Sequence, residues 1–337
     1  MGGRGSRSGI RSGSGGLPVI RGRRSPAGFL GGGGAGGGSP PGYSSSAADD
    51  ERLLRDRNGA QGGSTPGAPA GSHTRPPISL EGFDAYQRDW ESRYFGMLST
   101  EDKRYLQEQF QRVFENNGFY MNIQSRFLEN VADEHFKNQF ETGGRSGGAE
   151  FDASDLTPTN GRIEAAINMF GLDYTKMKAE DYEKYGSMQT LDLLTAAERS
   201  PAGYGDALVR FRREAVIDRT TYTLGDSLAA AECNDLVAGK VSEFQYTGIP
   251  VYEIPGMVDR AKAAEQYVTD AQMWDKVMEG VWSTYLEVQY HGRLTMSDVE
   301  SIVFTQAYNI PDAGVLGKLR SFGVKLYKYE GGRLIAL

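Results

Sequence analysis

The sequence predicts an α+β protein in which N-terminal helices precede a mixed, mostly antiparallel, β-rich C-terminal half. Two observations predict this class. Apolar residues recur at helical spacing between Phe83 and Phe140. From Ala207 the pattern changes to short runs of β-branched and aromatic residues, which are typical of strands. Helices and strands do not alternate regularly, which argues against a doubly wound parallel sheet.

Residues 1–79 are predicted to form a long disordered arm. They are rich in Gly, Ser and Pro, and the first 48 residues contain arginine but no acidic residue. Such a segment cannot bury enough apolar surface to offset the conformational entropy lost on ordering. We expect residues 80–337 to form a single α+β domain, with a helical part over about 80–205 and a β-rich part over about 206–337.

The helical part is expected to begin with an aromatic helix and a second helix that starts at Ser99, which is a favourable N-cap residue. Apolar periodicity then predicts further helices, and glycine ends one of them. The expected segments are helices over 83–94, 99–116, 122–140 and 161–170, and then loops and short helices over 172–205.

The β-rich part is expected to contain strands separated by helices and to end in a hairpin around Gly331-Gly332. Ser297-Asp-Val-Glu300 matches a capping box and predicts the start of a short helix. The expected segments are strands over 208–217, 219–224, 283–291 and 302–304, an extended piece over 244–254, helices over 226–238 and 258–280, and hairpin strands over 324–330 and 333–337.

The strand expected within Trp282–Gly292 carries an unusual set of polar side chains. With a period of two, Tyr285, Glu287, Gln289 and His291 fall on one face, opposite an apolar face. Buried carboxylate and imidazole groups must be paired, so such a row lines a cleft or a polar network. The alternative is an edge strand whose polar face meets water. The candidate catalytic residues are Glu287, Gln289 and His291.

A second stretch of interest, Lys137–Gly148, combines polar residues with four glycines. Glycine lets the backbone approach a ligand closely and exposes amide groups to an anion. Gln139 and Glu141 are candidate ligand contacts, with Arg145 and Ser146 beside them. The stretch matches neither the phosphate-binding loop nor the dinucleotide fingerprint. A flexible loop between helices is the alternative.

Composition restricts the classes of partner. The chain has a net charge of −7, and the arginine-rich N-terminus leaves the remainder more acidic still, so nucleic acid is not a favoured partner. One cysteine excludes a disulfide framework within one chain. His135 and His291 are the only histidines after residue 73, which excludes a histidine-rich zinc site in the folded part, and no metal is expected. No apolar run is long enough for a transmembrane helix, and no signal peptide is recognisable. We expect a cytoplasmic protein, or one delivered by a phage or a secretion system.

Three features occur in the order arginine, hydroxyl, glutamate over residues 205–337. They are Arg210 and Arg212 on one strand, Thr220, Thr221, Thr223 and Ser227 along the next, and Glu287 on a later one. This order resembles the pattern of the ADP-ribosyltransferases. The resemblance implies that NAD is the substrate, that an arginine holds the dinucleotide, that the hydroxyl strand supports the nicotinamide pocket, and that Glu287 stabilises an oxocarbenium-like transition state. Many members carry Gln/Glu-x-Glu, whereas Glu287-Val-Gln289 has the glutamate first.

The chain also resembles an uncharacterised family of bacterial and prophage proteins. The likeness lies in Asn138-Gln-Phe-Glu-Thr-Gly143, Arg219-Thr-Thr-Tyr-Thr-Leu-Gly-Asp-Ser227 and Tyr285-Leu-Glu-Val-Gln-Tyr-His-Gly292. It implies that the three motifs meet at one site. Together the two resemblances give the candidate cofactor-binding residues Arg210, Arg219, Thr221, Thr223, Asp226, Ser227, Gln139 and Glu141.

The functional hypothesis is an ADP-ribosyltransferase-like bacterial or prophage effector or toxin. Its partners would be a dinucleotide and a macromolecular acceptor. A nuclease-type effector is a second hypothesis, with His291 as general acid or base and Arg219 or Lys137 holding a phosphate. A third is a non-enzymatic phage or host-interaction protein, in which the polar groups form a buried structural network.

Overall fold

The computed structural model describes residues 81–142, 161–200, 204–225, 227, 236–243, 247–249, 251, 254–264 and 286–337. All of these belong to one compact unit, His73–Leu337. The predicted arm, residues 1–79, lies outside the described residues, and so do most of the helix predicted over 226–238 and the second half of the helix predicted over 258–280.

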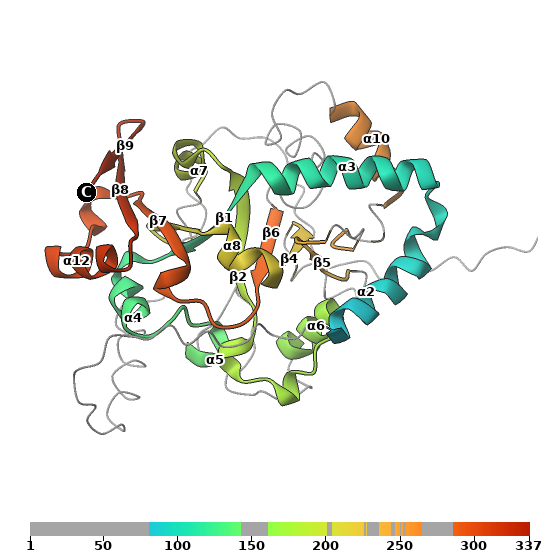
Figure 1. Cartoon of the computed structure of the whole chain (residues 1–337), viewed down its shortest axis with the longest axis horizontal. Coiled ribbons are helices and arrows are strands. Elements are labelled where there is room, and N and C mark those ends of the chain that lie inside the picture. Colours follow the sequence, from blue (N-terminus) through green and yellow to red (C-terminus); the bar gives the residue numbers. More distant parts are fainter. Residues whose placement is uncertain are drawn as a thin grey trace, which may run out of the picture. The chain divides into compact units, whose positions relative to one another are not determined.

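A nine-stranded sheet forms the centre of the described part, in the order β5-β4-β6-β2-β1-β3-β7-β8-β9 (Figure 1). Neighbouring strands run antiparallel except β7 and β8, which are parallel. The strands are β1 (Asn117–Ile123), β2 (Lys184–Thr190), β3 (Ala207–Phe211), β4 (Thr220–Leu224), β5 (Gly239–Lys240), β6 (Leu286–Tyr290), β7 (Val299–Phe304), β8 (Lys325–Glu330) and β9 (Arg333–Ala336). The predicted α+β class with a mostly antiparallel sheet is confirmed.

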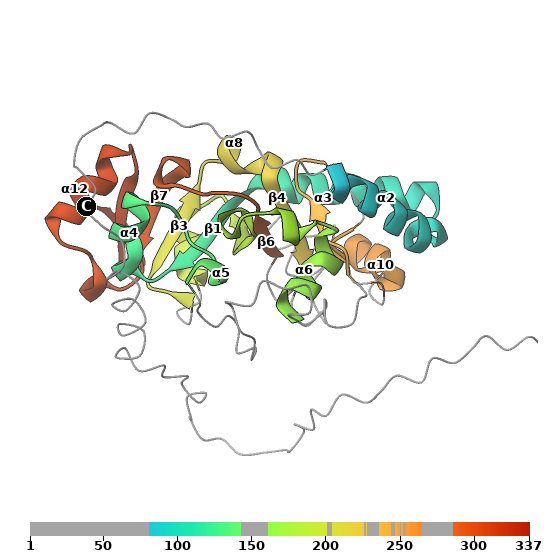
Figure 2. The ribbon, with the colours of Figure 1, turned by 90° about the horizontal axis from the view of Figure 1, so that it is seen from below.

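Helices lie at both ends of this sheet and beside its central strands. They are α2 (Glu81–Tyr94), α3 (Thr100–Asn116), α4 (Leu128–Asp133), α5 (Gln139–Thr142), α6 (Gly161–Phe170), α7 (Leu193–Arg199), α8 (Arg213–Val216), α10 (Ile254–Ala264) and α12 (Ala313–Ser321). Figure 2 shows α2, α3 and α10 at one end, and α12 with β7 at the other. The predictions for α2, α3 and α6 are confirmed: the Ser99 side chain accepts a hydrogen bond from the Asp102 amide, and Gly171 ends α6 with φ of 62°.

The end of β1 lies in a predicted helix, and β2 lies in a stretch that was predicted to be loops and short helices. The single helix predicted over 122–140 is wrong: β1 continues to Ile123, and within this range only α4 and the start of α5 are α-helical. A short 3-10 helix, α4 and a bridge between Phe136 and Leu294 follow β1. β2 lies within the stretch 172–205. Both strands gain their backbone hydrogen bonds from partners distant in sequence, which local periodicity does not reveal.

The short helix predicted at Ser297 is also wrong. The capping box begins at Thr295 and pairs with Asp298, and it covers only the 3-10 turn Met296–Asp298. Val299–Phe304 then forms β7 rather than a helix. The strands predicted over 219–224, 283–291 and 302–304 and the C-terminal hairpin are confirmed where described.

The main hydrophobic core covers one face of the sheet. Phe110 and Phe114 of α3 pack on Tyr222 of β4, with ring centroids 6.4 and 4.7 Å apart. Val288 and Tyr290 of β6 belong to the same core and are fully buried. Because side chains alternate along a strand, the residues between them on β6 project to the opposite face.

Candidate functional site

The opposite face of β6 carries the predicted polar row. β6 lies between β4 and β2, with Glu287 opposite Thr223 and Ser187, and Gln289 opposite Thr221 and Tyr185. Residues paired in register project to the same side of a sheet. We call these residues, together with His291, the polar face. All five residues of β6 are buried, so the strand is interior and its polar side chains do not simply meet water.

A chain of hydrogen bonds connects the polar side chains. The Gln289 amide donates from Nε2 to Glu287 Oε1 at 3.0 Å and to Thr223 Oγ1 at 3.1 Å. Thr221 Oγ1 donates to Gln289 Oε1 at 2.8 Å and lies 2.9 Å from His291 Nε2. Since the Thr221 hydroxyl has one hydrogen, it accepts from His291, which assigns the imidazole proton to Nε2.

His291 is fully buried at the end of β6. Phe170 of α6 packs edge-on against its ring, with centroids 4.8 Å apart. Burial, with a further contribution from the charge of Lys184, lowers the pKa of His291 to about 3. The imidazole is therefore neutral near pH 7. Its Nδ1 has no hydrogen-bond partner among the described residues.

Arg219 precedes β4, and both its guanidinium and its backbone carbonyl are engaged. Its guanidinium donates from Nη1 to Arg293 O at 2.6 Å and from Nε to Ala215 O at 3.1 Å, and Nη2 lies 3.2 Å from the Asp298 carboxylate. Its backbone carbonyl accepts from the His291 amide at 2.9 Å. Arg219 thus fastens the segment after β6 to the segment before β4.

Arg210 lies on β3, three strands from β6, because β2 and β1 stand between them. At a spacing of about 4.8 Å per strand, the backbone of Arg210 is roughly 14 Å from the backbone of Glu287. Its Nε lies 3.2 Å from the Glu300 carboxylate, and its Nη1 donates to Leu191 O at 3.3 Å. The structure therefore does not bring Arg210 together with Glu287.

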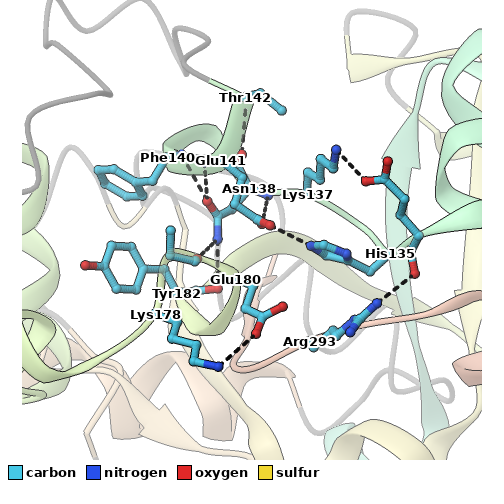
Figure 3. A network of polar contacts seen from close by, with 12 residues as sticks. His135, Lys137, Asn138, Phe140, Glu141, Thr142, Lys178, Glu180, Tyr182 and Arg293 are labelled. Atoms are coloured by element: carbon cyan, nitrogen blue, oxygen red, sulfur yellow. Dashed lines mark hydrogen bonds and ion pairs between the residues drawn. The ribbon is translucent and has the colours of Figure 1, made fainter. Parts of the chain in front are cut away.

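Asn138 makes most of the described hydrogen bonds of the first of the three sequence motifs, Asn138-Gln-Phe-Glu-Thr-Gly143 (Figure 3). Its Oδ1 accepts from the amides of Phe140 and Glu141 at 2.9 and 3.2 Å, and Glu141 Oε2 accepts from the Asn138 amide at 3.0 Å. This reciprocal arrangement is that of a capping box at the start of α5. Asn138 Nδ2 also donates to Ala179 O at 2.5 Å, which attaches the motif to the segment before β2.

Glu141 pairs with His135, with 2.5 Å between Glu141 Oε1 and His135 Nε2 (Figure 3). Burial alone would raise the pKa of Glu141, but hydrogen bonds from His135 and the Asn138 amide hold it below its ordinary value. The neighbouring Gln139 has a buried Oε1 without a partner in the described part of the chain.

Lys184 links the segment that Asn138 contacts to the end of β6. Its buried ammonium donates to the carbonyl oxygens of Glu180, Tyr182 and Gly292 at 2.9, 3.1 and 3.1 Å. Burial lowers the pKa of Lys184 to about 8. The second and third motifs therefore pair directly through β4 and β6, whereas the first joins them through the segment that ends at Lys184.

Glu183 is a buried carboxylate that lies outside the three sequence motifs. It accepts from the Tyr174 hydroxyl at 2.6 Å and from the Tyr185 hydroxyl at 3.2 Å. Alternating polar residues at 183, 185, 187 and 189 were the available signal, and they lie in the stretch assigned to loops and short helices. β2 therefore adds Tyr185, Ser187 and Gln189 to the same side of the sheet as Glu287.

Several candidate residues have little or no described environment. Asp226, Tyr285, Arg145 and Ser146 lie outside the described residues. Ser227 is buried, and its Oγ has no partner among the residues that the structure describes. Within this same part, no three His, Cys, Asp or Glu side chains are grouped so that they could hold a metal ion.

No family model matches the chain. Over 97 residues the chain is 29% identical to the Gene 2 protein of Mycobacterium phage L5, a match that covers 28% of this chain and 36% of that protein. The chain thus spans about a third of the length of this relative. The similarity supports an association with phage. No helix in the described ranges is both long and apolar enough to cross a membrane.

Proposed function

We propose that the chain is an NAD-using ADP-ribosyltransferase-like enzyme, encoded by a phage or prophage and acting as an effector or toxin. The observation that supports this most is the position of Glu287. The residue is 95% buried, its carboxylate accepts a hydrogen bond from the Gln289 amide, and its strand lies beside the hydroxyl-bearing strand β4.

This arrangement suits a reaction in which positive charge develops on the ribose. The bond between C1′ of the ribose and the nicotinamide nitrogen breaks, and its electron pair leaves with nicotinamide. An acceptor nucleophile then bonds to C1′ and releases its proton. A carboxylate that is already oriented in a poorly solvated site stabilises the oxocarbenium-like transition state without reorganisation. Gln289 fixes that orientation, because both of its amide hydrogens are engaged by Glu287 and Thr223.

The polar face supplies hydroxyl and amide groups rather than cations. Arg219 and Arg210 are engaged with Asp298 and Glu300, respectively. Under this proposal the two arginines support the sheet, and the polar face recognises the nicotinamide–ribose half of NAD. The macromolecular acceptor of ADP-ribose belongs to the same proposal.

A second candidate is a non-enzymatic phage interaction protein. The direct bonds among Thr221, Gln289, Thr223 and Glu287 favour it, because such a network also stabilises a sheet without any reaction. A nuclease that uses His291 receives less support. The neutral, fully buried imidazole cannot serve as a proton donor to a substrate near pH 7.

The proposal is tested with the purified chain, residues 1–337. NAD binding is measured by calorimetry, and nicotinamide release is followed by chromatography. The proposal predicts saturable binding at millimolar NAD or below and release of nicotinamide above the uncatalysed rate. If the chain neither binds NAD nor releases nicotinamide, the proposal is contradicted and the interaction protein is favoured. Cleavage of RNA that is lost in His291→Ala would favour the nuclease.

A further inference from the structure

Burial is uneven across the polar face. Thr221, Thr223, Glu287 and Gln289 on β4 and β6 are each at least 95% buried. On the adjacent strand β2, by contrast, Tyr185, Ser187 and Gln189 are only partly buried. We call these three residues the β2 strip. The β2 strip is therefore the more exposed border of the buried network.

Helices cover the sheet on both sides of the β2 strip. On the side of the strip where His291 lies, Phe170 of α6 packs against the His291 ring. On the other side, Ala196 and Ala197 of α7 pack with Tyr120 of β1 and Leu208 of β3. The partly exposed strip therefore lies between two parts of the sheet that helices cover.

Ser187 lies directly beside the proposed reacting centre. It pairs in register with Glu287, and opposite residues of antiparallel strands have Cβ atoms about 5 Å apart. A ligand group that contacts the Ser187 hydroxyl is thus within reach of the Glu287 carboxylate. Gln189 is the next residue along β2 on the same side.

The chemistry of the two side chains is neutral and complementary. Gln189 donates from Nε2 to Ser187 Oγ at 2.8 Å, which leaves the Ser187 hydroxyl hydrogen to act as a donor. Gln189 Oε1 is buried and has no hydrogen-bond partner in the described part of the chain. A buried acceptor without a partner is unfavourable, and a ligand N–H or O–H at this position would satisfy it.

We infer that Ser187 and Gln189 are substrate-contacting residues, which recognise the neutral hydroxyl and amide groups of the nicotinamide–ribose half of NAD beside Glu287. This inference rests on the proposed function and extends it to a strand that carries none of the three sequence motifs. The two residues have no charge with which to hold the phosphates, so the adenylate half of NAD lies beyond them.

The test compares Ser187→Ala, Gln189→Leu and the double variant with Gln111→Leu. Gln111 is an exposed glutamine of α3 whose amide donates to Glu115, and it serves as the matched control. KM and kcat for nicotinamide release are measured with NAD and with nicotinamide mononucleotide, which lacks the adenylate half. Thermal unfolding reports folding, and calorimetry with ADP reports binding of the other half.

We expect each single variant to raise KM about 10-fold for both substrates, as the loss of one hydrogen bond would. ADP affinity and the unfolding temperature stay at the native values, and Gln111→Leu behaves like the native chain. Native KM values in the double variant would overturn the inference while leaving the proposed function intact. An equal loss of ADP binding would also overturn it, because the residues would then act through the fold. A native chain that consumes neither substrate overturns both proposals.

Discussion

Gln289 and Glu287 are joined side chain to side chain on one buried strand, with 3.0 Å between Nε2 and Oε1. The same Gln289 accepts from Thr221, so the amide lies at the centre of a network that runs from His291 to Glu287. The orientation of Glu287 therefore depends on Gln289, and the stability of the sheet depends on both.

Replacing Gln289 by leucine should destabilise the protein strongly. The change leaves Thr221, Thr223 and Glu287 buried without their shared partner, and each such loss costs about 1–3 kcal/mol. We expect the free energy of unfolding, measured with urea, to fall by about 3 kcal/mol. The exposed Gln111→Leu variant should change it by less than about 0.5 kcal/mol. Equal effects in the two variants would contradict the buried network.

His291 should make the protein sensitive to acid. Its pKa is about 3 when folded and near 6.5 when unfolded, so between these values the unfolded chain binds more protons. Stability is then lost as the pH falls from 6.5 towards 3, by up to about 1.4 kcal/mol per pH unit. Unfolding free energies across this range should fall more steeply for the native chain than for His291→Gln. Parallel curves would show that His291 does not titrate in this way.

Lys184 should make the stability of the protein depend on pH in the alkaline range. Its pKa of about 8 in the folded protein lies below the ordinary value of 10.5, so between the two the unfolded chain again binds more protons. The native chain should therefore gain stability relative to Lys184→Met as the pH rises from 8 to 10.5. Urea unfolding of both proteins at several pH values measures this difference. A difference that stays constant or shrinks would rule out a buried, carbonyl-bound ammonium.

The ion pair between Arg219 and Asp298 should contribute to stability as a coupled pair. The two side chains are 18% and 19% exposed, so solvent screens them only in part. A double-mutant cycle with Arg219→Met and Asp298→Asn should give a coupling energy of about 1–2 kcal/mol. A coupling near zero would mean that the two groups act independently and would contradict the contribution of this ion pair to stability.

The sequence predicted the strands whose own pattern is strong. β4 is rich in threonine and aromatic residues, β6 alternates clearly, and a Gly-Gly pair separates β8 from β9. The alternation of β6 alone predicted that Glu287 and Gln289 lie on one side of the strand. That alternation could not show which strands flank β6, because the pairing with β2 joins residues about 100 positions apart.

β2 escaped prediction for a physical reason. Its sequence, Lys-Tyr-Gly-Ser-Met-Gln-Thr, has no apolar face and contains a central glycine. The tertiary structure requires that glycine, since a Cβ at Gly186 would collide with the Tyr120 carbonyl oxygen and the Tyr290 ring. Tyr290 donates to the same carbonyl at 3.0 Å. Packing across three strands thus outweighs the weak strand propensity of β2.

The most direct measurement of the central claim is the rate of nicotinamide release from saturating NAD by the native chain and by Glu287→Gln. Glu115→Gln, an exposed carboxylate on α3, is the matched control. If Glu287 stabilises the developing charge, its amide replacement should slow release at least about 100-fold, with NAD binding retained and Glu115→Gln fully active. Release by Glu287→Gln at the native rate would contradict the proposed role of this carboxylate.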